Sequence, residues 1–138
     1  AVRKRSFFIY RETPEGGTQM EFDYFYGPED AEQYQFYRIP KLLITSDQFK
    51  DVSAEAKLLY GLLLDRMAVS MKNHWLDEQN RAYIIYPIKE IAEDLSISQR
   101  KTSDYLSELE QFGLIEKKQR GQGKPSILYV KNFVYENV

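Results

Sequence analysis

Two groups of polar and cationic side chains lie in the last third of the chain, and their chemistry suits contact with nucleic acid. An arginine can donate two parallel hydrogen bonds to guanine, while hydroxyl, amide and ammonium groups reach phosphate oxygens. In residues 98–111 the polar positions recur on one side of a helical wheel and the apolar positions take the other. From this polar face we expect DNA contact by Ser98, Gln99, Arg100, Lys101, Ser103, Asp104 and Ser107.

The second group surrounds a turn at residues 121–125. Residues 114–120 and 126–130 alternate as two strands do, and Gly121 and Gly123 permit a tight reversal between them. The turn gathers side chains that can bind phosphates or enter the minor groove: Lys118, Gln119, Arg120, Gln122 and Lys124. Two plainer interpretations stay open, a solvated helix face for the first group and lysines that discourage sheet aggregation for the second.

Two predicted helices, residues 88–95 and 99–112, hold the first group. The first helix begins after Pro87, which suits a helix start, and has one apolar stripe formed by Ile88, Ile91, Ala92 and Leu95. Ile97 can pack between the helices, and Ser98 is a good N-cap for the second. The inner face of the second helix is set by Thr102, Leu106 and Leu109, flanked by Tyr105 and Phe112. Gly113 suits the positive φ that follows a helix end.

A longer helix precedes this pair, with Ser53 as its predicted N-cap. We expect it deep in the core, with one face formed by Ala56, Leu59, Leu62, Leu63 and Met67 and widened by Leu58, Leu64, Ala68 and Met71. Residues 73–81 read as a polar loop, and residues 83–86 as a strand that joins the later two in a three-stranded sheet. The order helix, strand, helix, helix, strand, strand predicts an α+β fold, a winged helix-turn-helix, which commonly binds the DNA major groove.

The first part of the chain has a different character. Aromatic segments at residues 7–10 and 20–26 flank a turn at residues 13–18, which predicts a β-hairpin that ends at residues 27–30. A lone hairpin is too small to be stable, so it must pack on the core or on another subunit. We therefore divide the chain into an arm with an N-terminal β-hairpin extension, residues 1–36, which we favour as a dimerisation element, and a DNA-binding domain, residues 37–138. On this interpretation, the core anchors at the start of the domain are Ile39, Leu42, Leu43 and Ile44.

Charge is unevenly distributed along the 138 residues, whose net charge is −2. Residues 98–131 carry seven Lys and Arg against four Asp and Glu, whereas residues 12–37 carry seven acids and no Lys or Arg. Such segregation is expected of a binding face opposite an acidic one, although both could be ordinary solvated surfaces. The chain has no cysteine, no apolar run long enough for a membrane span and no visible signal peptide, so we expect a cytoplasmic protein.

The sequence gives little support for a catalytic or metal site. His74 is the single histidine and lies in a polar stretch, so it cannot form a triad or a histidine-rich metal site alone. Glu90, Glu93 and Asp94 lie opposite an apolar helix stripe, which predicts a solvated face. The glycines before Lys124 lack the spacing of a phosphate loop. We expect no enzyme activity, no cofactor and no metal.

Five segments of the chain resemble a known family: residues 37–43, 53–66, 83–86, 109–115 and 123–130. The Ala-Lys-Leu-Leu-Tyr sequence at residues 56–60 is fairly specific, whereas Gly-Leu-Ile at residues 113–115 is common to winged helices. The pattern, over about residues 34–138, is similar to the amino-terminal domain of RepA_N-type replication initiators of Gram-positive plasmids.

This resemblance implies a protein that binds repeated DNA sites in a plasmid origin and starts replication. It also implies a separate C-terminal domain, similar to primosomal DnaD-type proteins, that recruits host replication proteins and is absent from this chain. Two alternatives stay open: a winged-helix transcriptional regulator, and a winged helix that contacts only other proteins. The chain begins with Ala1 instead of Met, which suggests a processed or excised segment.

Overall fold

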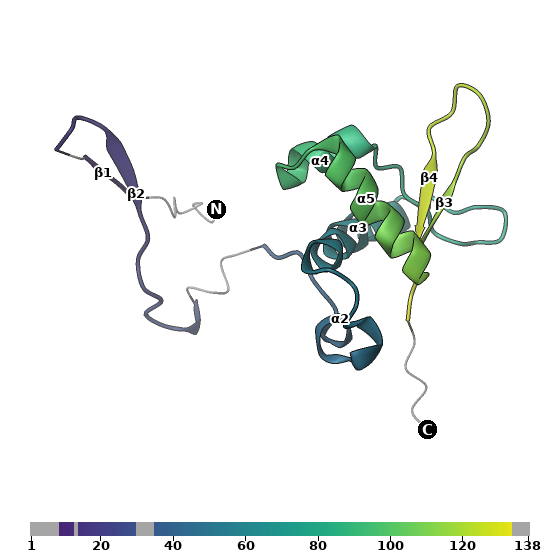
Figure 1. Cartoon of the computed structure of the whole chain (residues 1–138), viewed down its shortest axis with the longest axis horizontal. Helices are drawn as coiled ribbons and strands as arrows, with labels where there is room; N and C mark the ends of the chain where they lie inside the picture. The colour runs from purple at the N-terminus through teal and green to yellow at the C-terminus, as the bar shows by residue number, and fades with distance from the viewer. Residues whose placement is uncertain (1–8, 13, 30–34, 134–138) are drawn as a thin grey trace. The chain divides into compact units, whose positions relative to one another are not determined.

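The computed structural model of the chain describes residues 9–12, 14–29 and 35–133 (Figure 1). The chain divides into two compact units, residues 1–36 and residues 37–138. The smaller unit contains the antiparallel strands β1 (Ile9–Glu12) and β2 (Thr18–Glu21). The larger unit contains α2 (Lys41–Thr45), the 3-10 turn η1 (Asp47–Phe49), α3 (Ala54–Lys72), α4 (Ile88–Leu95), α5 (Gln99–Phe112), β3 (Ile115–Lys118) and β4 (Ile127–Val130).

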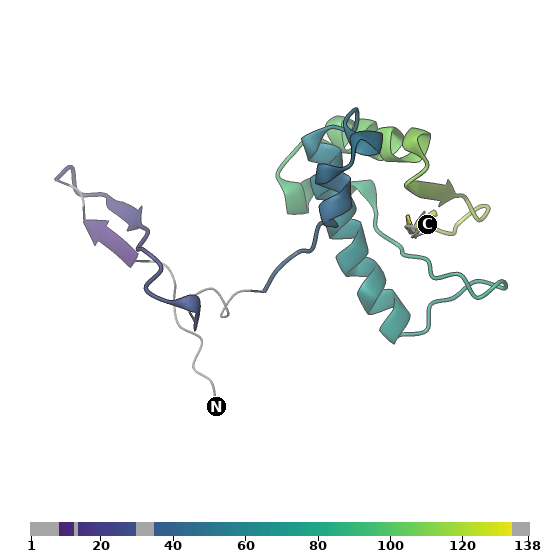
Figure 2. The ribbon, with the colours of Figure 1, turned by 90° about the horizontal axis from the view of Figure 1, so that it is seen from below.

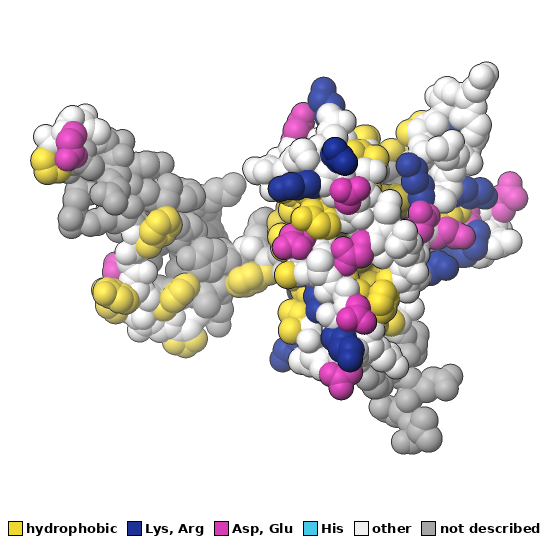
Figure 3. Space-filling view, viewed as in Figure 1, with side chains coloured by type: hydrophobic (Ala, Val, Ile, Leu, Met, Phe, Trp, Pro, Cys, Tyr) yellow, Lys and Arg dark blue, Asp and Glu magenta, His cyan; other side chains and the backbone are white. Residues whose placement is uncertain are grey.

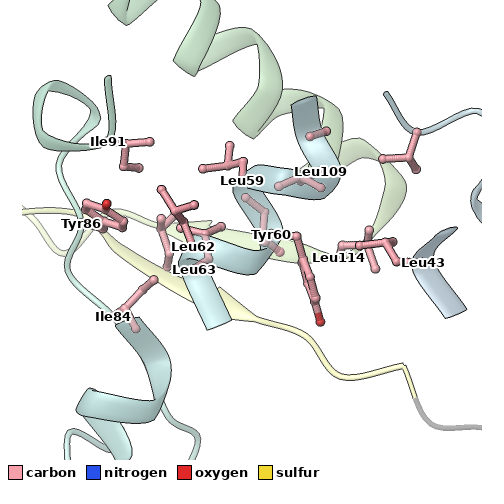
Figure 4. Packing of buried hydrophobic residues seen from close by; sticks show 14 of the residues in the cluster. Leu43, Leu59, Tyr60, Leu62, Leu63, Ile84, Tyr86, Ile91, Leu109 and Leu114 are labelled. Atoms are coloured by element: carbon pink, nitrogen blue, oxygen red, sulfur yellow. The ribbon is translucent and has the colours of Figure 1, made fainter. Parts of the chain in front are cut away.

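The core of the larger unit forms around α3, the long helix in Figure 2. Ser53 is its N-cap, because the Ser53 Oγ accepts a hydrogen bond from the backbone N–H of Ala56 at 3.2 Å. Four apolar side chains from three helices pack together and are fully buried. Burial of each side chain stabilises the fold by about 1.5–3 kcal/mol. The four are Leu59 and Leu63 of α3, Ile91 of α4 and Leu109 of α5 (Figure 4).

The buried face of α3 is narrower than the sequence predicts. Leu58 is 45% exposed and Met71 is 56% exposed, and Ala68 is exposed as well. The reason is that α5 and β4 pack along one side of the helix and leave the other side uncovered within this unit. The prediction for α2 is also partly wrong, since Leu43 is fully buried whereas Ile44 is 63% exposed.

The helix-turn-helix follows the sequence closely. Between α4 and α5, Ser96 adopts a left-handed conformation with φ of 56°, and Ile97 is half-buried between the helices. The Ser98 Oγ then accepts a hydrogen bond from the backbone N–H of Lys101 at 3.1 Å and caps α5. At the other end Gly113 has a φ of 90°, the left-handed conformation predicted for it. Both helix boundaries and the N-cap are thus confirmed.

The wing is the antiparallel pair of β3 and β4, in a register that runs from Ile115 opposite Val130 to Lys118 opposite Ile127. The predicted third strand is reduced to one bridge, in which Ile84 exchanges two hydrogen bonds of 2.9 Å with Leu128. Next to this bridge the segment pairs with the loop, where Ala82 bridges Leu76 and the Tyr83 N–H donates to the Trp75 carbonyl oxygen at 3.3 Å. The prediction of a three-stranded sheet is therefore wrong in detail, although the segment around Ile84 does lie beside β4 as predicted.

In the arm, the hairpin pairs Ile9 with Glu21 and Glu12 with Thr18. Residues 7 and 8, part of the predicted first strand, lie outside the described residues. The second strand ends at Glu21, five residues earlier than predicted. Beyond it, the Asp23 Oδ1 accepts hydrogen bonds from the Tyr24 N–H at 2.7 Å and the Tyr26 hydroxyl at 3.1 Å, so residues 22–26 make local contacts and no strand.

Gly61 should tolerate no side chain, although it lies within α3. A Cβ built there would lie 3.0 Å from Ile39 Cγ1 and 3.2 Å from the carbonyl oxygen of Arg38. Replacing glycine by alanine inside a helix ordinarily stabilises it by about 1 kcal/mol. Here we expect Gly61→Ala to lower the free energy of unfolding by about 1–3 kcal/mol, because the backbone of the 38–39 segment must move. Urea denaturation checks this, and a stabilised variant would contradict it.

Candidate nucleic-acid interface

The outward face of α5 carries the polar side chains that the sequence predicts there. Opposite it, Thr102 and Leu109 have no exposed surface. The exposed residues from the predicted set are Ser98, Gln99, Arg100, Lys101, Ser103, Asp104 and Ser107. Figure 3 shows cationic and acidic side chains interspersed over the helices. The buried positions therefore fix which side of α5 is presented to solvent.

Ser98 already has a structural role. Its hydroxyl oxygen caps α5, and its carbonyl oxygen accepts a hydrogen bond from the Thr102 hydroxyl at 2.9 Å. The second bond gives the buried Thr102 hydroxyl a hydrogen-bond partner. Backbone and side-chain hydrogen bonds thus both stabilise the first turn of α5. DNA contact by Ser98 stays a prediction.

The sequence did not reveal how α5 is fixed against α3. Glu108, half-buried on α5, accepts hydrogen bonds from the Ser53 N–H at 2.5 Å and from the Ser53 hydroxyl at 2.8 Å. A carboxylate at the N-terminus of a helix is favoured by the unpaired N–H groups and by the helix dipole. The side chain of one helix therefore completes the cap of another, 55 residues away in the sequence, and no local pattern signals such a pair.

A second carboxylate of α5 fixes the wing. The Glu110 Oε2 accepts a hydrogen bond from the backbone N–H of Lys117 on β3 at 2.9 Å. Two of the three acids on this helix thus bind backbone or hydroxyl donors of neighbouring elements. For Asp104, the third, the part of the chain that the structure describes provides no hydrogen bond or ion pair.

The acids of α4 were predicted to form a solvated face, and Glu93 and Asp94 are exposed while the Glu90 side chain is 46% exposed. Glu90 forms an ion pair of 2.7 Å with Arg66 of α3, and Asp94 accepts a hydrogen bond from the Tyr86 hydroxyl. The Arg66 guanidinium lies 4.0 Å from the centre of the Tyr86 ring. Burial and the bond to Asp94 raise the pKa of Tyr86 to about 12, so its hydroxyl stays a donor. This network holds α4 against α3.

The two faces of the wing carry different cations. Lys117 borders a cleft of about 290 Å³ that is lined by residues 85–88, by Leu106 of α5 and by the wing. Lys118 and Arg120 border a separate hollow on the other side of the wing. Lys117 is therefore the wing cation that shares a cleft with a residue of α5, and the sequence analysis missed it. Strand alternation could have found it, because Lys117 lies two residues from the buried Ile115.

The tip of the wing is shaped by its glycines and by Arg120. Gly121 and Gly123 have φ values of 95° and 80°, as the predicted reversal requires. The Arg120 Nε donates a hydrogen bond to the Pro125 carbonyl oxygen at 3.3 Å, and its guanidinium lies 5.8 Å from the Tyr83 ring centre. The other predicted wing residues, Lys118, Gln119, Gln122 and Lys124, are exposed. Arg120 is thus the most restrained of the predicted wing contacts.

Asp77 organises the loop between α3 and the Ile84 bridge. Its Oδ1 accepts hydrogen bonds from the backbone N–H groups of Gln79 and Arg81, both at 2.8 Å. Its Oδ2 accepts from the Arg81 Nε at 2.8 Å and from the Tyr129 hydroxyl at 2.9 Å. Burial alone would raise the pKa of Asp77, but these donors outweigh it and hold the pKa well below its ordinary value.

Other kinds of site find no support among the described residues. His74 is exposed, with a φ of 57°, in the loop where the sequence places it. No group of three or more metal-binding side chains comes together in residues 9–12, 14–29 and 35–133. Across the same residues, no helix combines the length and the apolar character that crossing a membrane requires.

Comparison with known proteins agrees with this geometry. The sequence profile of RepA_N, “Replication initiator protein A (RepA) N-terminus”, matches residues 35–138. A “41 kDa protein” of Lactobacillus helveticus is 26% identical over 81 residues, which are 59% of this chain and 23% of that protein. The chain thus spans about a quarter of the length of that relative.

Three solved structures are also similar. One described as “N-Terminal domain of DNA binding protein” and one as “Structure of Rep-DNA complex” are each 32% identical, with a TM-score of 0.68; each match covers 83% of this chain and 87% or 88% of the other. “Structure of MDR initiator” is 29% identical with a TM-score of 0.64, over 82% of this chain and 89% of that one. These similarities confirm the predicted α+β winged-helix fold.

Glu108→Gln should destabilise the domain. The substitution removes the charge that strengthens both bonds to Ser53, and hydrogen bonds to charged groups contribute about 1.5–3 kcal/mol. We expect the free energy of unfolding to fall by about this amount in urea denaturation. Glu116→Gln is the matched control, because Glu116 is exposed on β3. Equal stabilities of the two variants would show that the bonds from Glu108 to Ser53, the Glu108 clamp, contribute nothing to stability.

The stability that Asp77 provides should depend on pH. Because its pKa in the folded chain is held below the ordinary 3.8, its contribution is complete well above pH 3.8 and is lost progressively as the pH falls below that value. Asp77→Asn should therefore be less stable than the parent at neutral pH, and the difference should shrink in acid. Chemical denaturation from pH 7 to pH 3 measures it. A difference that stays constant over this range would be evidence against the network.

Proposed function

The chain belongs to the RepA_N family, and we propose that it is the DNA-binding part of a replication initiator, which binds repeated double-stranded sites in a plasmid origin. The observation that supports this most is the outward face of α5, a row of exposed polar side chains on a helix whose other side is locked into the core. The wing follows directly, as in a module that reads the major groove with a helix and grips the backbone beside it. A relative described as a Rep-DNA complex has the same fold.

We assign distinct tasks to the elements. Arg100 and Lys101, exposed near the N-terminus of α5, are placed where a recognition helix contacts base edges. The cations of the wing bind phosphates and fix the register of the domain on the duplex. The role we propose is binding without catalysis, in the cytoplasm, where plasmid DNA is present.

Recruitment of host replication proteins is the remaining part of the proposal. The chain covers 23% of its relative from Lactobacillus helveticus, and the rest of that relative is long enough for such a task. Footprinting on the plasmid that encodes the protein tests the proposed function. We expect protection of several tandem sites within the origin, and protection of one palindrome over a promoter would favour a transcriptional regulator instead.

Arg100→Ala should weaken binding to the origin repeat. If Arg100 makes a bidentate contact with guanine, its loss costs about 1–3 kcal/mol, or roughly 5- to 150-fold in Kd. Fluorescence anisotropy with a labelled repeat measures the change. Gln111→Ala is the control, since Gln111 is exposed at the far end of the same helix. If both variants bind as the parent does, α5 does not read the site through Arg100.

The arm should mediate self-association. Phe22 is 80% exposed and Tyr24 is 83% exposed, and a second copy of the chain is the partner we propose for these aromatic side chains. Self-association also suits repeated sites, because linked contacts raise avidity. We expect Phe22→Ser with Tyr24→Ser to shift the chain from dimer or larger species to monomer in sedimentation at tens of micromolar. A parent chain that is already monomeric there would disprove this.

A further inference from the structure

The side of the wing that faces away from α5 has a hollow of its own. It measures about 340 Å³ and lies between the wing and the loop of residues 73–82; we call it the wing–loop hollow. Its wall on the wing includes Lys118, Arg120 and Tyr129, and its wall on the loop includes Asp77, Glu78 and Arg81. Figure 1 shows this loop projecting beside the strands β3 and β4.

The loop is fixed in this position. A β-bridge pairs Leu76 with Ala82 across its base, and Asp77 binds two backbone N–H groups within the loop. The Tyr129 hydroxyl of β4 donates to Asp77, and the Arg81 guanidinium lies 4.8 Å from the centre of the Tyr129 ring. The loop and the wing therefore form one rigid pair of walls, so the space between them is available without rearrangement.

The charge of the hollow favours an anion. Arg81 is matched by Asp77 through their ion pair of 2.8 Å. Two cations, Lys118 and Arg120, then face one remaining carboxylate, Glu78, which is exposed. The hydrogen bond from the Arg120 Nε to the Pro125 carbonyl holds that guanidinium at the wall and leaves its terminal nitrogens to bind a ligand. The hollow therefore has an excess of one positive charge, which the single negative charge of a phosphodiester group balances.

We propose that the wing–loop hollow receives a sugar-phosphate strand of the same duplex, the one that borders the minor groove on the side away from α5. A hairpin that enters a minor groove has one strand on each side of it. Lys117 lies on the side facing α5 and meets the near strand, whereas Lys118 and Arg120 meet the far strand. The loop of residues 73–82 then becomes a third DNA-contacting element. This inference rests on the proposed function and extends its footprint.

Matched lysine variants of the whole chain test the proposal. The DNA is a duplex selected for binding from a randomised library, together with copies that carry one uncharged methylphosphonate linkage at successive positions of either strand. On the unmodified duplex, Lys117→Gln and Lys118→Gln should each weaken binding several-fold and flatten the salt slope by about 0.9. The linkage that abolishes the effect of Lys118→Gln should lie on the strand opposite to the one that abolishes the effect of Lys117→Gln.

The acid of the hollow provides an independent readout. Glu78→Gln removes the carboxylate beside the phosphate and should tighten DNA binding several-fold. Asp65→Asn makes the same change of charge at an exposed position of α3 outside the hollow, and should have a smaller effect. Equal effects of the two variants would mean that only the net charge matters, and would overturn the proposal.

The remaining outcomes separate this inference from the proposed function. If Arg100→Ala and Lys117→Gln weaken binding while Lys118→Gln leaves affinity and salt slope unchanged, the domain binds DNA and the hollow does not. If one strand accounts for both lysines, the wing lies along the groove wall and the hollow is empty of DNA. If the parent chain binds no duplex at low salt, both proposals fail.

Discussion

The rest of the structure depends on the way α5 is held, because this helix must bury one face and leave the other open. Leu109 and Thr102 have no exposed surface and determine which side points inward. Burial alone leaves the helix able to slide or tilt, since apolar contacts are not directional. The carboxylate of Glu108 removes that freedom by binding both the N–H and the hydroxyl of Ser53 at the start of α3. The outward row of side chains is therefore presented in one orientation.

Acidic side chains serve the module in two different ways. Glu108, Glu110, Asp94 and Asp77 each accept hydrogen bonds from a neighbouring element, and so connect α5, the wing, α4 and the loop to the core. Asp104, in contrast, stays on the outward face with no such bond in the described part of the chain. A carboxylate at that place repels phosphates, because both are negatively charged, but it can accept a hydrogen bond from the amino group of cytosine. It therefore favours sequence specificity at the expense of affinity for DNA. The modest net charge of the chain is thus compatible with a DNA-binding face.

The sequence predicts best what depends on neighbouring residues. The limits of α5, the Ser98 cap and the left-handed Gly113 follow from local backbone chemistry, and the structure confirms them. It predicts less well what depends on distant residues. The exposed side of α3, the single bridge at Ile84 and the Glu108 clamp are decided by which elements lie alongside, and no periodicity within one segment contains that information. Lys117 is an intermediate case, because strand alternation from Ile115 points to it.

The most direct test of the claim that α5 and the wing form the DNA interface is a titration of the isotopically labelled chain with a short cognate duplex, followed by amide NMR. The account predicts that the largest shifts fall on residues 98–107 of α5 and on the wing, residues 117–126. Amides in the middle of α3, around the fully buried Leu59 and Leu63, should change little. Shifts concentrated on α2 or on the exposed side of α3, with α5 and the wing unaffected, would contradict it.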